Sequence, residues 1–370
     1  MTGKIATYVL PDEEDVLAVD ELTRSIVSGP ADAVLDIQRL APEFDAALWS
    51  TLSDSGLTLM STPETSGGSG AGIVESATVV RVAAEHAVAL PLAECDLLAA
   101  WLLTTAGRAV PAHPQSAGTG PVTVGPSYNG NRRVSGACDR VPWARDVESV
   151  VVLGETSDEE SVVLSVPIAQ ATVLPGRNLA HEPRDRIVFD IEVPDDAVTP
   201  VPERTAAEWM YRGALARSVQ LLGVLETALD LSVEHVTERS QFGRSLAKFQ
   251  AVQILVADAA GEVAATSAAC TAAVQRAAMH GFDSPATEFA IAVAKAQASR
   301  AATAVTRNAH QVHGAIGFTL DHRLRHFSLR ARAWQSEFGD ARYWEQQLGA
   351  LALDSGGADP WAMLSSGIDG

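Results

Sequence analysis

The pattern of apolar and polar positions changes twice along the chain. From about residue 11 to 106, apolar residues recur at helical spacing in the stretches 12–27, 42–57, 71–87 and 92–107. The first stretch opens with DEED, and acidic residues are favoured at a helix N-terminus. A loop rich in Ser, Gly and Pro, STPETSGGSGAG, follows the second stretch. The pattern predicts a helical N-terminal domain.

From about residue 107 to 200, short runs of β-branched residues alternate with turns of Gly, Pro, Asp and Asn. The runs are GPVTVGPS, RRVSGACDRV, VESVVVLGE, SVVLSVPI and DRIVFDIEVP. Alternating or clustered β-branched residues between such turns are typical of strands. Several short strands predict a small β-barrel or sandwich.

From about residue 204 the pattern is helical again, in the long stretches 214–239, 249–280 and 285–314. Their Ala-rich faces permit close helix packing, as in a bundle. A shorter helical pair, 323–335 and 340–353, closes the chain. We therefore expect an α+β protein with a helical domain over 1–106, a β domain over 107–200, a four-helix bundle over 201–354 and a flexible tail over 355–370.

Composition excludes some classes of protein. The 370 residues include 46 acidic and 27 basic residues, a net charge of -19, which argues against binding to nucleic acid. The three cysteines are far apart and form no CxxC pair, which fits a reducing compartment and no metal site. The N-terminus lacks the apolar core of a signal peptide, and no apolar run predicts a membrane span. We expect a cytoplasmic protein.

Two polar segments interrupt the long helical stretches. ERSQFGRSLAKFQ begins at Glu238, and QVHGAIGFTLDH begins about seventy residues later at Gln311. In this order of helices, strands and helices, the two segments resemble the acyl-CoA dehydrogenase family. STPETSGGSG, RRVSGACDRVPWARDVESVVV and HEPRDRIVFDIEVPDDAV are similar to further segments of that family. The resemblance covers nearly the whole chain.

In that family FAD lies between the β domain and the bundle, and its ADP half crosses a subunit boundary. Arg239, Gln241 and Phe242 match the family's Arg-x-[Thr/Gln]-Phe-Gly segment, which contacts the pyrophosphate and adenine side. A planar guanidinium can donate two hydrogen bonds to phosphate oxygens, and an aromatic ring can cover an apolar part of the cofactor. Alternatively, Arg239 and Arg244 are solvated charges at a helix end, and Phe242 belongs to the core.

The second segment is similar to the family's Gln-x-x-Gly-Gly turn, which reaches the same ADP group from a neighbouring subunit. Gln311, Gly314 and Ala315 occupy its positions, with Ala315 in place of the commoner second Gly. Small residues let the backbone approach a ligand closely. We expect His313 and His322 to be packing or hydrogen-bonding residues rather than ligands or bases.

The resemblance also implies a carboxylate base, which removes an α-proton from an acyl-CoA thioester while a hydride leaves to the flavin. In many members this Glu lies between the last two long helices, where this chain has WQSEFGD. Counted without gaps from Gln311, the Glu falls on Phe338. Glu337 is therefore the candidate base if the alignment slips by one, Asp340 is the next, and Glu337 is otherwise a helix-terminal carboxylate. Other members place the base at the position of Gly213.

The β domain departs from the family at two segments that hold the flavin ring. The Thr-Glu-Pro…Gly-Ser-Asp segment has no counterpart in GPVTVGPSYNGNRRVSG. Arg140-Val141-Pro142 stands where the family has Trp-Ile-Thr. Pro has no backbone N–H to donate and lacks the Thr hydroxyl. The residues for the ADP side are thus present, and those for the isoalloxazine side are not.

This combination resembles one subunit of the actinobacterial α2β2 acyl-CoA dehydrogenases associated with steroid side-chain degradation. The resemblance implies an FAD-dependent oxidoreductase of lipid β-oxidation, active with a paralogous subunit that carries the base. A homotetramer that uses Glu337, and a flavin-free scaffold subunit, are the alternatives. The family's usual electron acceptor is an electron-transfer flavoprotein.

Overall fold

The computed structural model describes residues 13–35 and 40–354. These residues form two compact units. One comprises the described parts of Met1–Gln38, Ala77–Val88 and Gly213–Gly370, and the other comprises Arg39–Ser76 and Ala89–Arg212. The predicted tail 355–370 lies outside the described residues. Helices, then strands, then helices follow one another along the chain, which confirms the predicted α+β class. The division into three domains stays a prediction.

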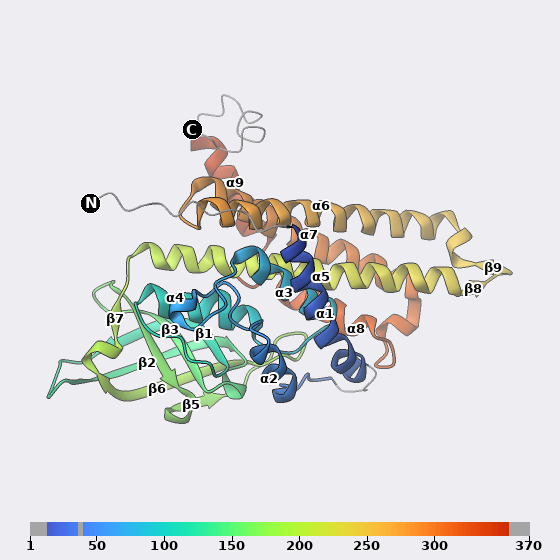
Figure 1. Cartoon of the computed structure of the whole chain (residues 1–370). Helices are drawn as coiled ribbons and strands as arrows, with labels where there is room; N and C mark the ends of the chain where they lie inside the picture. Colours follow the sequence, from blue (N-terminus) through green and yellow to red (C-terminus); the bar gives the residue numbers. More distant parts are fainter. Residues whose placement is uncertain (1–12, 36–39, 355–370) are drawn as a thin grey trace. The chain divides into compact units, whose positions relative to one another are not determined.

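A seven-stranded sheet forms the second unit, with strand order β5-β6-β2-β1-β3-β4-β7 (Figure 1). Its strands are β1 (Gln115–Val124), β2 (Asn131–Pro142), β3 (Ser149–Glu155), β4 (Ser161–Pro167), β5 (Ala171–Leu174), β6 (Arg184–Pro194) and β7 (Thr199–Pro200). Neighbours are antiparallel except β1 and β3, which are parallel. The five predicted runs overlap β1, β2, β3, β4 and β6. The short strands β5 and β7 were missed because so few residues show no periodicity.

Side chains alternate along β6 in the way that a half-buried strand requires. Ile187, Phe189 and Ile191 are buried, whereas Val188 and Asp190 between them are exposed. The interior strand β3, between β1 and β4, is instead buried over six of its seven residues. The inward side chains of these strands join in one apolar core under the sheet.

The helices of the sheet unit are short. They are α2 (Ala46–Asp54), η1 (Glu64–Ser66), η2 (Glu94–Ala100), α4 (Trp101–Thr105), η3 (Ala144–Asp146), η4 (Ile168–Gln170) and η5 (Asp195–Ala197). η2 is a π-helix, and its buried Asp96 accepts hydrogen bonds from Ser61 N, Thr62 Oγ1 and Ser76 Oγ at 2.9, 2.9 and 2.6 Å. One carboxylate therefore fixes the start of the Ser- and Gly-rich loop to this helix.

Long helices make up the other unit. They are α1 (Glu13–Leu35), α3 (Ile73–Glu85), α5 (Arg204–Glu238), α6 (Gln250–His280), α7 (Pro285–His313), α8 (Leu324–Trp334) and α9 (Ala341–Asp354), with the short elements β8 (Ser240–Gln241), β9 (Arg244–Ser245), η6 (Leu246–Lys248) and η7 (Gly314–Phe318). The first residues of α3 and α5 belong to the sheet unit. Small buried residues, mostly Ala, line α7 and let its neighbours approach closely.

The helix α6 corrects one expectation from the sequence. By length and composition it could cross a membrane, and only 22% of its most apolar stretch is buried. Its polar side chains nevertheless bond to α7. Asn308 Nδ2 donates to Asp258 Oδ2 and Gln297 Nε2 donates to Glu262 Oε2, both at 2.8 Å. α6 is thus a helix of the bundle with a largely exposed apolar face.

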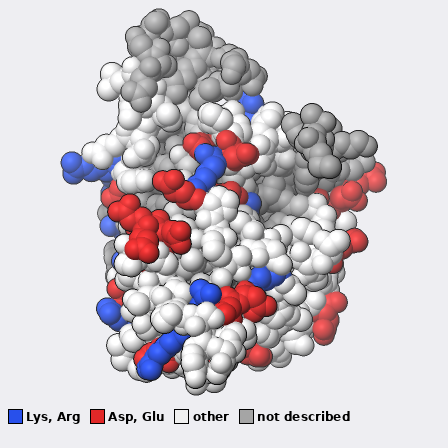
Figure 2. Space-filling view, turned by 90° about the vertical axis from the view of Figure 1, so that its left-hand side faces the viewer, with Lys and Arg blue, Asp and Glu red and all other residues white. Residues whose placement is uncertain are grey.

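Charged side chains on the face drawn in Figure 2 are interspersed, with basic groups next to acidic ones. Ion pairs of the sheet unit also join basic to neighbouring acidic side chains, such as Arg133 with Asp190 and Arg132 with Asp195. On this face of the described residues, Lys and Arg do not merge into a continuous basic surface.

Candidate functional site

The ERSQFG segment forms a tight hairpin after α5. Ser240 pairs with Ser245 and Gln241 with Arg244, and Phe242 and Gly243 make the two-residue turn with φ of 53° and 80°. A left-handed conformation is uncommon for Phe. The ring of Phe242 is 89% exposed, so its assignment to the core is wrong.

The two cations of this hairpin differ in their surroundings. Arg244 lies over the ring of Phe249, with its guanidinium carbon 4.1 Å from the ring centroid. The side chains of Arg239 and Gln241 are exposed, and neither forms an ion pair or a side-chain hydrogen bond with another described residue. A phosphate could therefore bind Arg239 without displacing an internal partner.

The second predicted segment is the end of α7. Gly314 caps the helix with φ 65° and ψ -142°, a combination that favours Gly, and nothing lies within 4 Å of a Cβ placed there. Gln311, Gly314 and Ala315 are all exposed. Two apolar side chains beside them, Ile316 and Phe318, are 46% and 73% exposed. The turn thus presents open backbone beside an apolar surface.

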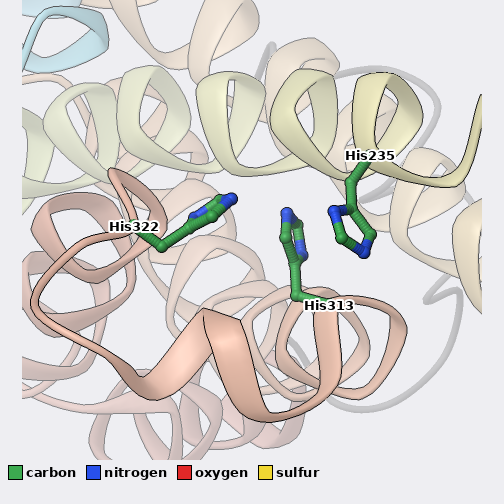
Figure 3. Close-up of side chains that lie close together, drawn as sticks. All are labelled: His235, His313 and His322. Atoms are coloured by element: carbon green, nitrogen blue, oxygen red, sulfur yellow. The ribbon is translucent and has the colours of Figure 1, made fainter. Parts of the chain in front are cut away.

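The structure brings the end of α5, which precedes the first segment, into contact with the second segment. His235, four residues before Arg239, stacks on His313 of the second segment with ring centroids 4.5 Å apart (Figure 3). His322 lies edge-on to His313 at 4.6 Å. From the sequence we expected His313 and His322 to be packing or hydrogen-bonding residues. Nothing in the sequence indicated that they contact each other or His235.

The candidate base Glu337 is engaged in an ion pair. Its Oε2 accepts a hydrogen bond from Arg217 Nε at 2.7 Å, and the two side chains are only 9% and 2% exposed. Arg217 also donates to the side chain of Gln220. The rings of Trp334 and Phe338 lie 5.8 and 5.9 Å from the guanidinium carbon. The carboxylate is thus desolvated but already paired with a buried cation.

Phe338 closes this loop onto α5. It adopts a left-handed φ of 55°, followed by Gly339 at 86°. A Cβ placed on Gly213 would lie 2.1 Å from a ring carbon of Phe338, so the ring is seated directly on the helix backbone. The resemblance assigns the family's base to one of these two positions. They face each other here, and neither carries a carboxylate.

The buried Lys295 holds the same loop through hydrogen bonds to its backbone carbonyls. Lys295 Nζ donates to Gln335 O, Gly339 O and Ser299 Oγ at 2.9, 2.6 and 3.0 Å, and the residue is fully buried. Burial lowers its pKa to about 7. Trp344 Nε1 donates to Phe338 O at 2.9 Å. The sequence missed Lys295, although a single Lys in the Ala-rich run AIAVAKAQAS was a signal for it.

We expect Gly213→Ala to lower the free energy of unfolding by about 1–3 kcal/mol, because the new methyl displaces the Phe338 ring. Ala otherwise favours a helix by about 1 kcal/mol over Gly. Gly261→Ala in α6 is the control, since nothing lies within 4 Å there and it should stabilise. Urea unfolding measures both. In a Phe338→Ala background Gly213→Ala should become stabilising, and a persistent loss would contradict this packing.

Two observations concern the segment that departs from the family in the β domain. Arg140 and Trp143 are left-handed, with φ of 56° and 55°, and Pro142 O accepts a hydrogen bond from Ser116. The sheet unit also contains a cavity of about 890 Å³. Its lining includes Thr119, Val122, Leu153, Glu155, Trp209 and Met210. Polar and apolar side chains both line it, so it lacks the mostly apolar walls of a typical small-molecule site.

Known proteins resemble this chain along its length. Residues 204–342 match the family described as acyl-CoA dehydrogenase, C-terminal domain. The acyl-CoA dehydrogenase FadE27 of Mycobacterium tuberculosis is 27% identical over 83% of this chain and 88% of its own length. A chain of the ChsE4-ChsE5 complex from Mycobacterium tuberculosis has a TM-score of 0.82 at 24% identity, covering 93% of this chain and 98% of that one. A chain of the Tcur3481-Tcur3483 steroid ACAD has a TM-score of 0.79 at 22% identity, covering 93% and 99%.

Proposed function

Because the chain belongs to the acyl-CoA dehydrogenase family, we propose that it is the non-catalytic subunit of an FAD-dependent complex that oxidises an acyl-CoA thioester between its α and β carbons. A paralogous subunit supplies the base, and this chain supplies the ADP side of a shared flavin site. The observation that carries the proposal is the closed loop of this chain, in which Phe338 is seated on Gly213 and Glu337 pairs with Arg217.

The residues present fit the ADP half of FAD. Arg239 would bind the pyrophosphate through its exposed guanidinium, and Gln241 and Gln311 would donate hydrogen bonds from their exposed amides. Phe242 would cover the adenine side, and the turn at Gly314 would allow close backbone approach. When bound, FAD supplies the acceptor for the hydride that leaves the β-carbon.

A second subunit also accounts for exposed apolar surface. The face of α6 is largely uncovered, and Phe242, Ile316 and Phe318 are exposed at the predicted cofactor segments. The similar ChsE4-ChsE5 structure is a complex of two named proteins, and another similar structure is a steroid ACAD. We therefore propose a paralogous partner, a steroid side-chain CoA thioester as substrate, an electron-transfer flavoprotein as acceptor and a cytoplasmic location.

The test compares the chain purified alone with the chain co-expressed with a paralogous acyl-CoA dehydrogenase. We expect colourless protein alone, and a flavin spectrum between 400 and 500 nm, on the order of one FAD per pair of chains, after co-expression. Yellow protein that is reduced by an acyl-CoA without any partner would contradict the proposal. Colourless protein in both preparations would support a flavin-free scaffold.

A self-sufficient homotetramer with Glu337 as base is the second candidate. The observation in its favour is that the Glu337 side chain is 9% exposed, which gives it a desolvated carboxylate. Glu337→Gln in the flavin-loaded enzyme separates the two candidates. Loss of an essential base lowers turnover by about 10²–10⁴-fold, whereas a non-catalytic Glu337 leaves it unchanged.

A further inference from the structure

Three histidines of the helical unit meet outside the loop 335–340 that carries Glu337, here called the base loop. His235 comes from α5, His313 is the last residue of α7, and His322 lies between η7 and α8. One ring nitrogen of each lies within 4.8 Å of the others (Figure 3). The proposed function gives these side chains no role, although they join the last turn of α5 before the first segment to the second segment.

Hydrogen bonds determine where the ring protons are. His313 Nδ1 lies 2.7 Å from Ala309 O, and since a carbonyl only accepts, Nδ1 carries the proton and Nε2 the lone pair. Leu324 N–H donates to His322 Nδ1 at 3.1 Å, so the proton of a neutral His322 is on Nε2. Figure 3 shows the outer nitrogen of His322 directed toward His313. A metal ion would need a lone pair at this nitrogen, so the cluster is arranged as neutral rings rather than as metal ligands.

The surroundings of the cluster disfavour a positive charge. Burial lowers the pKa of His235 and of His313, and it lowers the pKa of His322 to about 4. At His313 the carbonyls of Ala309 and Leu231 act in the opposite direction and raise the pKa. The charged groups that act on the three rings are one another, His310 and Arg239. All of these are cationic when charged, so each protonation makes the next more difficult.

We propose that the His235–His313–His322 cluster is a positioning device that holds the end of α5, from which the 239–245 hairpin follows, against the 311–322 turn, and that proton uptake by the cluster releases FAD. His235 lies on the last turn of α5 before Arg239, and His313 lies two residues after Gln311. His322 anchors the other end of the turn through Leu324 at the start of α8. The inference rests on the proposed function, because it assumes that each of the two segments binds the ADP group of an FAD.

The sign and size of the effect follow from linkage. The pKa of His322 is about 4 when the turn is closed and returns to its ordinary value of 6.5 when the turn is open. The closed form is therefore favoured above pH 6.5, and its stability relative to the open form decreases as the pH falls toward 4. At pH 5 the ratio of open to closed form rises about 30-fold through His322 alone. Binding of FAD weakens by the same factor only where the open form predominates, so about 30-fold is the upper limit of the effect.

The experiment measures FAD release from the co-expressed complex by flavin fluorescence at pH 7.5 and 5.0 and constant ionic strength. We expect weaker binding at pH 5.0, by at most about 30-fold, reversed on neutralisation. His322→Asn keeps an acceptor for Leu324 N–H through Oδ1 but cannot titrate, and it should remove most of this change. His280→Asn, at the exposed end of α6, should keep the full pH dependence.

Several results would overturn the proposal. A His322→Asn variant with unchanged pH dependence assigns the histidine a structural role alone. Stoichiometric binding of Zn²⁺ to the wild-type complex, absent from His322→Asn, would make the cluster a metal site. A complex without flavin at either pH refutes the proposed function instead. In that case, hydrogen exchange of the 314–324 amides tests whether protonation of the cluster loosens the 311–322 turn. Equal protection factors at both pH values would refute the positioning role of the cluster.

Discussion

Arg217→Met should lower the free energy of unfolding of the chain by about 3–5 kcal/mol, because it leaves the carboxylate of Glu337 buried without its cation. Arg217 is 2% exposed, and its Nε donates to Glu337 Oε2 at 2.7 Å. Met has a similar length and fills the space beside Trp334 and Phe338. Urea unfolding followed by far-ultraviolet circular dichroism gives the measurement.

Two further variants isolate the charge. Arg217→Met combined with Glu337→Gln removes both charges and should recover at least half of the loss. Arg300→Met is the matched control, because the pair of Arg300 and Glu345 is 59% and 46% exposed and should leave the unfolding midpoint unchanged. A loss no greater for Arg217→Met than for Arg300→Met would show that the buried pair does not hold the loop.

Asp185→Ala should cost the sheet unit about 3 kcal/mol, since it removes the acceptor of a network around the β2–η3 segment. Asp185 is fully buried and accepts hydrogen bonds from Arg145 N and Gly176 N, both at 3.0 Å. Its carboxylate also pairs with the guanidinium of Arg145, which raises the pKa of that group. The substitution strands two backbone donors and one cation.

Thermal unfolding of Asp185→Ala and Asp185→Asn tests this account. Asn keeps one acceptor oxygen and should lose less than Ala. Asp190→Ala removes the exposed partner of Arg133 on the neighbouring part of β6 and should leave the midpoint unchanged. Equal midpoints for Asp185→Ala and Asp190→Ala would contradict the network's role.

Local pattern was sufficient to predict most of the fold. Period-2 runs of β-branched residues predicted β1, β2, β3, β4 and β6, and helical periodicity predicted the long helices. The resemblance to the family was carried by the order of elements and by two short segments around Arg239 and Gln311, and known members of the family are similar to this chain. These features are local, because each depends only on residues that are close together in the sequence. Which of the segment residues contact FAD stays a prediction.

The structure decided what local pattern cannot show. Phe242 lies in an apolar-polar sequence compatible with a core position, yet its left-handed turn directs it to solvent. The base loop carries Glu337 beside Phe338, and only packing determines that the ring is seated on Gly213 while the carboxylate pairs with Arg217. Arg217 and Glu337 are 120 residues apart. Their contact depends on how α5 and the loop before α9 pack, and helical periodicity carries no record of it.

The sequence by itself determined the class of fold and predicted the family resemblance and the segments that could bind a dinucleotide, because these depend on periodicity, turn residues and short motifs. The tertiary structure alone decided that the three histidines meet and that Lys295 and Arg217 close the base loop. Both are contacts between side chains of different helices. Such contacts arise from burial and charge pairing across the bundle, and one helix does not specify which residue of another it will meet.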